Sequence, residues 1–213
     1  MMRLSKKSRV RPFGLVAVGV TTFSLVLCRC ASHQEFSDPE TLATYLASRD
    51  RYHQEVRTGA TTLSVTYRPT DLILAKEVHE QTTAGELAQM RQHYENYLYF
   101  QLSLQHNDRA WLTAQVINPS YGELVRTLSF RMSEHLRLIT PSDTLLPVST
   151  YHDRMYGLAN ATELLVAFPR DGIREKERVR LVVNEFGGRL GQHAFPFAST
   201  DLLNEPNIQF TTR

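Results

Sequence analysis

Residues 98–105, Leu-Tyr-Phe-Gln-Leu-Ser-Leu-Gln, place apolar side chains at every second position, from Leu98 to Leu104. Successive side chains of an extended strand point to opposite faces, so this alternation predicts a strand with one buried face. The turn-forming pair Asn107-Asp108 comes next, and a similar alternation resumes over 112–116. Two alternating segments joined by such a turn predict a β-hairpin at the centre of the fold.

Further alternating or apolar segments of strand length lie on both sides of this hairpin. They are residues 61–68, 124–132, 136–139, 145–149, 162–168, 178–186 and 192–197. The last three are joined by turn signals and predict a three-stranded meander, with Pro196 on an edge strand, where the missing N–H costs least. This many short strands with regular turns favour two antiparallel sheets packed face to face.

Helical signals concentrate before the hairpin. Ser37-Asp38-Pro39-Glu40 is a typical helix start, and apolar spacing predicts a helix over 39–56 that Gly59 ends. A helix is also favoured over 71–81, and a capping box at Thr83 begins another that runs to residue 95. The expected fold is therefore mostly β: an antiparallel β-sandwich preceded by two or three α-helices. An immunoglobulin-like topology is one form of it, although the cysteine pair of antibody domains is missing.

The composition indicates one globular domain and excludes cysteine-based sites from most of the chain. The chain has 213 residues, 42% hydrophobic and 22% charged, as in one ordinary globular domain. Its two cysteines, Cys28 and Cys30, both follow the one long apolar stretch. The chain beyond them therefore has no thiol for an internal disulfide, a cysteine zinc site or a cysteine nucleophile.

The N-terminus has the pattern of a secretory signal. Residues 1–12 carry five cations and no acid, and residues 13–27 are apolar and uncharged. Fifteen helical residues span about 22 Å, less than the roughly 30 Å of a bilayer's hydrocarbon core, which favours a signal over a stable membrane span. Leu25-Val26-Leu27-Cys28 follows. This motif resembles the lipobox of bacterial lipoproteins, although Leu27 stands where that family normally has a small residue.

The resemblance implies that Cys28 is lipid-modified and becomes the first residue after cleavage. The expected organisation is then a signal peptide over 1–27, a lipidated cysteine and polar tether over 28–36, and a single domain over 37–213. Gram-negative lipoproteins retained at the inner membrane favour Asp after the cysteine. Arg29 stands there instead, so the outer membrane or the periplasmic face is the expected location. The alternative is an uncleaved amphipathic anchor with two incidental cysteines.

Cleavage would also change the charge. The whole chain has 24 cations and 22 anions, and loss of the five cations of the signal leaves a net charge of −3. A nucleic-acid-binding domain needs a concentrated positive face to neutralise phosphates. No nucleic-acid partner is therefore expected.

Catalytic motifs are incomplete. His79-Glu80 begins a metalloprotease-like motif, but Thr83 replaces the second histidine that would bind zinc. There is no G-x-S-x-G elbow, and Gly187 to Gly191 form no nucleotide-binding fingerprint. We expect no catalytic residue, metal or cofactor. An envelope hydrolase remains an alternative, and its weak candidate residues, dispersed in the sequence, are His152, Asp153, Glu163 and His193.

Aromatic side chains are the candidates for binding, because they dominate the contact energy of many interfaces. One group lies at a predicted helix-strand junction and the other in a predicted loop; they are Tyr94, Tyr97, Tyr99, Tyr151, His152 and Tyr156. The sequence thus favours a non-enzymatic interaction or assembly module with an envelope protein partner. A carrier of an apolar ligand is a further alternative, with a cavity lined by Leu98, Phe100, Leu102, Phe168 and Leu181.

Overall fold

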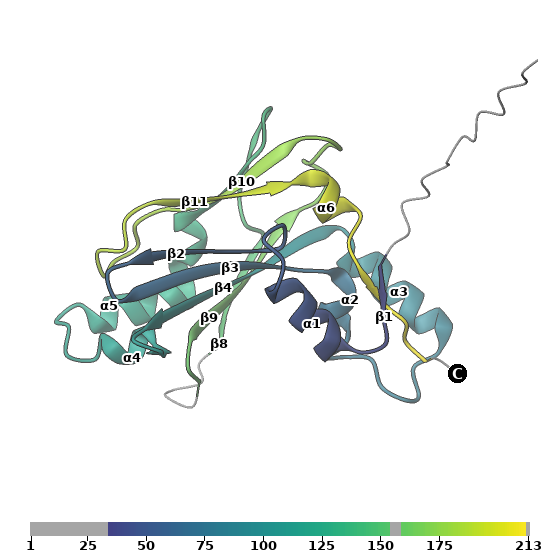
Figure 1. Cartoon of the computed structure of the whole chain (residues 1–213), viewed down its shortest axis with the longest axis horizontal. Coiled ribbons are helices and arrows are strands. Elements are labelled where there is room, and N and C mark those ends of the chain that lie inside the picture. Colours follow the sequence, from purple (N-terminus) through teal and green to yellow (C-terminus); the bar gives the residue numbers. More distant parts are fainter. Residues whose placement is uncertain (1–33, 154–158, 212–213) are drawn as a thin grey trace, which may run out of the picture. The chain divides into compact units, whose positions relative to one another are not determined.

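The computed structural model describes residues 34–153 and 159–211, and the chain from residue 33 onward forms one compact unit. Its described part is mostly β, with antiparallel sheets and a few short helices (Figure 1). The expected signal peptide and Cys28 lie outside the described residues. No helix within 34–153 and 159–211 is long and apolar enough to cross a membrane.

The largest sheet is built on the predicted central strand. In spatial order its strands are β2 (His53–Thr58), β3 (Thr61–Arg68), β4 (Tyr97–His106), β9 (Thr162–Pro169) and β8 (Ser149–Asp153), with short β5 (Arg109–Ala110) paired to β4. Every neighbouring pair is antiparallel. β3 alternates between buried and half-buried residues along its whole length, as the sequence predicted.

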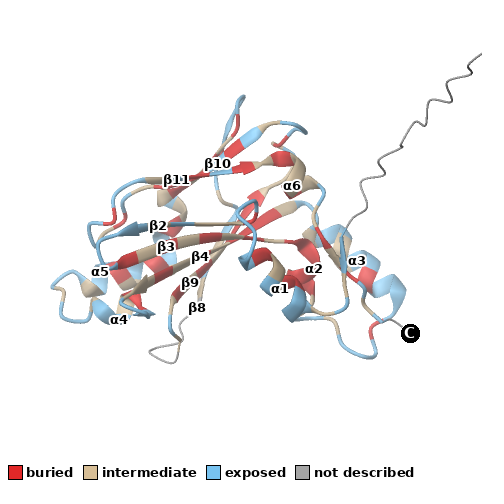
Figure 2. Ribbon diagram, in the orientation of Figure 1, coloured by how far each residue is buried: buried red, intermediate tan, exposed pale blue. Residues whose placement is uncertain are grey.

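A second sheet is also antiparallel. Its strands, in spatial order, are β11 (His193–Ala198), β10 (Arg178–Val183), β6 (Leu136–Ile139) and β7 (Thr144–Leu145). Side chains of both sheets belong to one hydrophobic cluster, which includes Leu102 of the first sheet and Leu181 of the second. Figure 2 shows the buried residues along the strands of both sheets. Pro196 lies on the edge strand β11, where the sequence predicted it.

Short helices lie beyond both ends of the large sheet's strands (Figure 1). At one end are α1 (Pro39–Ala47), α2 (Thr70–Leu74) and α3 (Ala84–Tyr94); at the other are α4 (Trp111–Ala114) and α5 (Tyr121–Arg126). The π-helix η1 (Thr127–Arg131) and the 3-10 helix η2 (Met132–His135) continue from α5 and contact β8. α6 (Ser199–Leu203) follows β11. β1 (Glu35–Phe36) and β12 (Asn207–Ile208) form a parallel pair, so part of the expected tether belongs to the folded body.

The helices expected ahead of the sandwich do not form an uninterrupted helical segment: β3 lies between α1 and α2 as the strand predicted over 61–68, but β2, where helix was expected, lies there too. α1 ends at Ala47, and the chain from His53 onward pairs with β3 instead of extending the helix. Gly59 has a φ of +60° in the turn between β2 and β3, so it serves a hairpin and not a helix end. The capping box of Thr83 and Glu86 is present as predicted.

Two strand predictions were wrong. Residues 124–132 are helical, because Leu124, Leu128 and Met132 recur at intervals of four and bury one helical face. The second strand of the hairpin after β4 has only two residues, since α4 begins at Trp111.

Trp111 is fully buried against Gly188. The φ of Gly188 is +72°, and a Cβ at this position would lie 2.2 Å from the Trp111 ring.

The meander prediction was also wrong in its pairing. β10 and β11 pair as predicted, but β9 pairs with β4 and β8 in the other sheet. Local turn signals cannot specify these partners, because β4 and β9 are far apart in sequence.

Candidate functional site

The clearest cluster of charged side chains lies at the end of the large sheet near α2 and α3. Asp71 of α2 accepts two hydrogen bonds from Arg91 of α3, Nε to Oδ1 and Nη2 to Oδ2, each 2.8 Å long. Its Oδ2 also accepts from the backbone N–H of Ile208 at 2.8 Å. The Asp71 side chain is only 5% exposed, so this bidentate pair fastens α2, α3 and β12 together.

A second ion pair lies beside the first. Arg170, just after β9, contacts Glu205 through Nη2 and Oε2 at 3.0 Å. The Tyr67 hydroxyl and the Thr70 backbone N–H both donate to the same carboxylate. Burial, reinforced by the charge of Glu205, raises the pKa of Tyr67 well above its ordinary value. Burial opposes the charge of Arg170, but Tyr67 and Glu205 outweigh that effect and raise its pKa.

The two ion pairs border a small polar cavity of about 190 Å³. The charged residues that line it are Asp71, Arg91, Glu95, Arg170 and Glu205, joined by Thr70 and Asn207. Two buried atoms of lining residues, Thr70 Oγ1 and Arg170 Nε, have no hydrogen-bond partner among the described residues. Both atoms have almost no accessible surface, so they do not face the cavity.

Two larger hollows adjoin this cavity through shared lining residues. One, of about 410 Å³, shares Glu95 and Arg170 with it and is also lined by Tyr97. The other, of about 730 Å³, lies between α3 and β12 and shares Arg91. Glu95, the residue that follows α3, lines all three.

The chemistry available at this cluster is recognition of polar or charged groups. The Asp71 and Glu205 carboxylates are already held by guanidinium groups, and the ionisable hydroxyl of Tyr67 is held in its neutral form. Over residues 34–153 and 159–211, no group of three or more histidine, cysteine, aspartate or glutamate side chains could hold a metal ion.

The tyrosines predicted at the helix-strand junction lie beside this cluster. Tyr97 is half-buried and lines the 410 Å³ hollow. Tyr99 is only 7% exposed, and its hydroxyl donates to the backbone oxygen of Tyr94 at 3.3 Å. Burial raises the pKa of Tyr99. Tyr94 donates to the carboxylate of Glu77. Of the three, Tyr97 is thus the one placed to meet a ligand at the hollow.

The second predicted surface falls on strand β8 and not on a loop. Tyr151 is 63% exposed, and His152 is half-buried. Tyr156 lies outside the described residues. Leu146 and Val148, just before β8, are 57% and 55% exposed. Among the described residues β8 pairs with β9 alone, so three exposed apolar side chains lie within six residues at a sheet edge.

The residues of the hydrolase alternative do not converge. Asp153 and Glu163 are register partners on β8 and β9. His193 lies on β11 and contacts Thr58 of β2, with 3.5 Å between Nε2 and Oγ1. β2 and β8 are opposite edges of the same sheet, four strand spacings or about 19 Å apart. The histidines at 152 and 193 therefore cannot share one site.

The residues of the carrier alternative form part of the solid core. All five are buried, and aromatic rings pack against one another among them, with 6.1 Å between the ring centroids of Phe100 and Phe168 and 5.2 Å between those of Phe100 and Phe197. Such packing uses these side chains as ordinary core.

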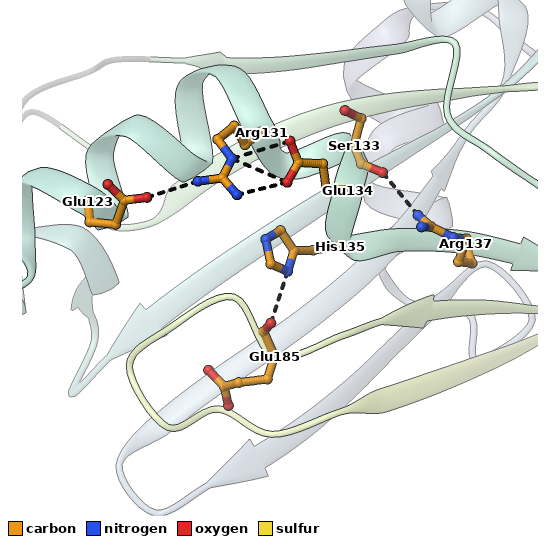
Figure 3. Close-up of polar contacts among 7 residues, drawn as sticks. All are labelled: Glu123, Arg131, Ser133, Glu134, His135, Arg137 and Glu185. Atoms are coloured by element: carbon orange, nitrogen blue, oxygen red, sulfur yellow. Dashed lines mark hydrogen bonds and ion pairs between the residues drawn. The ribbon is translucent and has the colours of Figure 1, made fainter.

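A third polar cluster ties the helical segment to the loop after β10 (Figure 3). Arg131 contacts Glu123 and Glu134, at 3.1 and 2.9 Å, and holds the pKa of Glu134 below its usual range. His135 Nδ1 lies 2.9 Å from the backbone oxygen of Glu185. The ion pairs are solvent-exposed, and such pairs contribute little to stability or binding.

Sequence reasoning missed the charged cluster, because its members come from distant segments. The sequence offers only that Asp71 directly precedes the apolar run Leu72-Ile73-Leu74. Comparisons of the chain with protein-family models, with curated proteins and with solved structures find no match.

Proposed function

We propose that this chain is a secreted, lipid-anchored cell-envelope protein that acts as a non-enzymatic interaction or assembly module. The basic and apolar N-terminal pattern ending at Cys28 supports the anchor. The exposed edge at β8 supports the interaction. This edge carries the proposal, and the partner it fits is an extended segment of another envelope protein.

Strand β8 has the properties of an edge that takes up an additional strand. Natural edge strands are usually protected by charges, prolines, bulges or a covering element. The other edge of the sheet, β2, has exposed Glu55 and Arg57 and is bonded to β11 through Gln54 and the backbone oxygen of Pro196. β8 instead presents Tyr151 and contains no Lys or Arg; its one acidic residue, Asp153, ends the strand, Pro147 precedes it, and η1 and η2 contact it. Backbone pairing would give affinity, and the apolar side chains would give specificity.

The fold that would carry this surface is, in our proposal, the antiparallel β-sandwich expected from the sequence. The shared hydrophobic cluster of the two larger sheets supports it. β2 and β11 would close one side of the sandwich, and β8 would border the other.

The test is site-specific photo-crosslinking in native cells. A photoreactive phenylalanine analogue at position 151 should give one discrete adduct with an envelope protein. The same analogue at Glu55, an exposed residue on the opposite edge, should not give that adduct. Leu146→Ser combined with Val148→Thr should reduce the adduct at 151 about tenfold, the loss expected when about 1.4 kcal/mol of apolar contact is removed. No adduct at 151, or equal adducts at both positions, would overturn the proposal.

The anchor has its own measurement, which does not depend on a partner. Mass spectrometry of the N-terminus from the membrane fraction should find a diacylated or triacylated peptide that begins at Cys28. An unmodified N-terminus would remove the lipid anchor and the envelope location from the proposal, and would leave the uncleaved amphipathic segment as the alternative.

A further inference from the structure

The second sheet presents a basic face on its side away from the hydrophobic cluster. Along β10, β11 and β6, residues on this side alternate with buried ones, and the pairing register brings them together. The described strand residues on this side, which we call the basic face, are Arg137, Ile139, Thr144, Arg178, Arg180, Val182, Ala194, Pro196 and Ala198. None of these residues is acidic, so three guanidinium groups are the only charges on the basic face.

The register fixes how the three arginines are spread. Arg178 and Arg180 are two residues apart on β10, which separates their Cα atoms by about 6.7 Å. Arg180 pairs with Ile139, so Arg137 on β6 is its diagonal neighbour, about 7–8 Å away. The cations therefore extend across the sheet instead of converging on one point. This spread suits a surface with many anionic groups better than one small anion.

The three arginines form no ion pair with another described residue. Arg178 and Arg180 are exposed. Arg137 donates to backbone oxygens, that of Ser133 at 3.1 Å and that of Leu136 at 2.6 Å (Figure 3 shows the first). Their charges are therefore not balanced by a carboxylate of the described chain.

The acidic residues within two positions of these strands are engaged elsewhere. Glu134 pairs with an arginine of η1, and one carboxylate oxygen of Glu177 is buried. Asp143 accepts from the backbone N–H of the next residue at 2.6 Å. Glu185 accepts from two backbone N–H groups of the loop that follows β10. The arginines are thus left to meet an anionic group from outside the chain.

We propose that the basic face docks on an anionic lipid bilayer, where Arg137, Arg178 and Arg180 contact headgroup phosphates. An arginine can donate two parallel hydrogen bonds to phosphate oxygens. The side chains beside the arginines, such as Ala194 and Pro196, are small or apolar and lose little solvation when headgroups approach. The net charge of −3 expected after cleavage means that an anionic bilayer repels the molecule as a whole. The basic face would therefore set the orientation of the domain on the membrane.

This inference rests on the proposed lipid anchor, which would keep the domain close to a membrane. Cys28 precedes Gln34 by six residues, or at most about 22 Å of extended chain. The backbone oxygen of Gln34 accepts from Asn207, at the start of β12. The chain reaches β12 through α6 from the end of β11 that pairs with Arg178 (Figure 1). The route toward the anchor thus leaves from one end of the basic face.

The test is fluorescence quenching of the full, lipid-anchored chain reconstituted in vesicles. A fluorescent amino acid replaces exposed Ala194 on the basic face or, as the control, exposed Glu55 on the large sheet, and a quencher is attached to lipid headgroups. In vesicles of phosphatidylcholine and phosphatidylglycerol, position 194 should be quenched much more than position 55. In phosphatidylcholine alone, or at about 1 M salt, where the Debye length is about 3 Å, the difference should disappear. Equal quenching at both positions, or quenching at 194 that does not depend on phosphatidylglycerol, would overturn the proposal.

Two variants test the charges. Arg178→Gln and Arg180→Gln each remove an exposed guanidinium that bonds to no other described residue, so the fold should be retained. Each should lower the ratio of docked to undocked chains about fivefold, which corresponds to about 1 kcal/mol per basic residue near an anionic bilayer. The matched control, Arg109→Gln, removes an exposed arginine of β5 and should leave the quenching unchanged. Unchanged quenching in the Arg178→Gln/Arg180→Gln double variant would contradict the proposal.

Failure of this inference can be distinguished from failure of the proposed function. A chain without the lipid anchor would leave the vesicles at high salt, whereas an anchored chain that does not dock would stay with them and remain unquenched at position 194. The photo-crosslinked adduct at position 151 should form equally in the double variant. Loss of that adduct would assign the basic face to an acidic region of the protein partner and would refute docking on lipid.

Discussion

The end of the large sheet near α2 and α3 buries charge, whereas the β8 edge exposes hydrocarbon. At the first, the side chain of Asp71 is almost fully buried with its arginine partner. At the second, Leu146, Val148 and Tyr151 are each more than half exposed. Both arrangements invert the usual distribution, in which apolar groups are inside and charges are in water. The two regions therefore differ in what a substitution should cost.

The comparison separates side chains that the chain needs in order to fold from side chains whose role depends on a partner. A buried ion pair costs desolvation and is disrupted when either partner is lost, so its side chains are needed by the folded chain itself. An exposed apolar side chain contributes little to the isolated fold, so its value depends on what covers it. Substitutions at the charged cluster should lower stability, and substitutions at β8 should leave it nearly unchanged.

The largest effect is expected for Asp71→Ala. It removes the two hydrogen bonds from Arg91 to the carboxylate and the acceptor of the Ile208 N–H, and it leaves the guanidinium without its counter-charge. Because Arg91 is partly exposed, the cost should lie below that of a fully buried pair, at about 2–4 kcal/mol of unfolding free energy. Urea denaturation measures it. A change below 1 kcal/mol, on the order of an exposed pair's worth, would erase the contrast with β8.

Glu205→Gln should cost less, about 1–3 kcal/mol, because an amide oxygen can still accept from Tyr67 and Thr70 while Arg170 loses its counter-charge. The same denaturation experiment at low and high salt separates the loss of the counter-charge, which depends on salt, from the change in hydrogen bonding, which does not. Salt should affect this buried pair less than the exposed pair of Arg131 and Glu134, which serves as the control.

Alkaline pH should weaken the same end of the molecule. Burial raises the pKa of Tyr52 to about 12, and its ring stacks on Tyr67 with 6.2 Å between centroids. The unfolded chain releases the Tyr52 proton near pH 10, and the folded chain keeps it to about pH 12. Stability should therefore fall between these values, by at most about 1.4 kcal/mol per pH unit for each such tyrosine. Tyr52→Phe should make that slope shallower; an equal slope would contradict the assignment.

The smallest effect is expected at β8. Leu146→Ser and Val148→Thr should each change the free energy of unfolding by about 0.5 kcal/mol or less, because neither side chain is buried. A larger loss would mean that this edge belongs to the internal packing of the chain. The contrast between a stabilising charged cluster and a β8 edge that does not stabilise the fold would then be wrong.

The sequence predicted what depends on neighbouring residues. The alternation from Leu98 to Leu104 identified β4, and the capping box at Thr83 marked the start of α3, because both signals act within a few residues. It misassigned 124–132, where the interval of four between Leu124, Leu128 and Met132 is the helical signal that was overlooked. Of the candidate binding residues, Tyr97 and Tyr151 have accessible positions, and Tyr99 does not.

What could not be predicted depends on distant residues brought together. Asp71 and Arg91 are 20 positions apart, and no periodicity links them. β4 has β3 on one side and β9 on the other, and the β9 partner is distant in sequence, as the pairing of Leu102 with Leu164 shows. The polar cavity is the product of both, because its walls come from α2, α3, the end of β9 and the approach to β12.

The parallel pairing of β1 with β12 has a mechanical consequence. Backbone hydrogen bonds of 2.9 Å run from Asn207 N to Gln34 O and from Gln209 N to Phe36 O. Tension on the chain ahead of residue 34 would load these two bonds first, before any strand of the larger sheets. Since Ile208 is bonded to Asp71, that tension would be transmitted to α2 and to the ion pair behind it. Tension on the N-terminal segment would thus change the positions of residues that line the polar cavity.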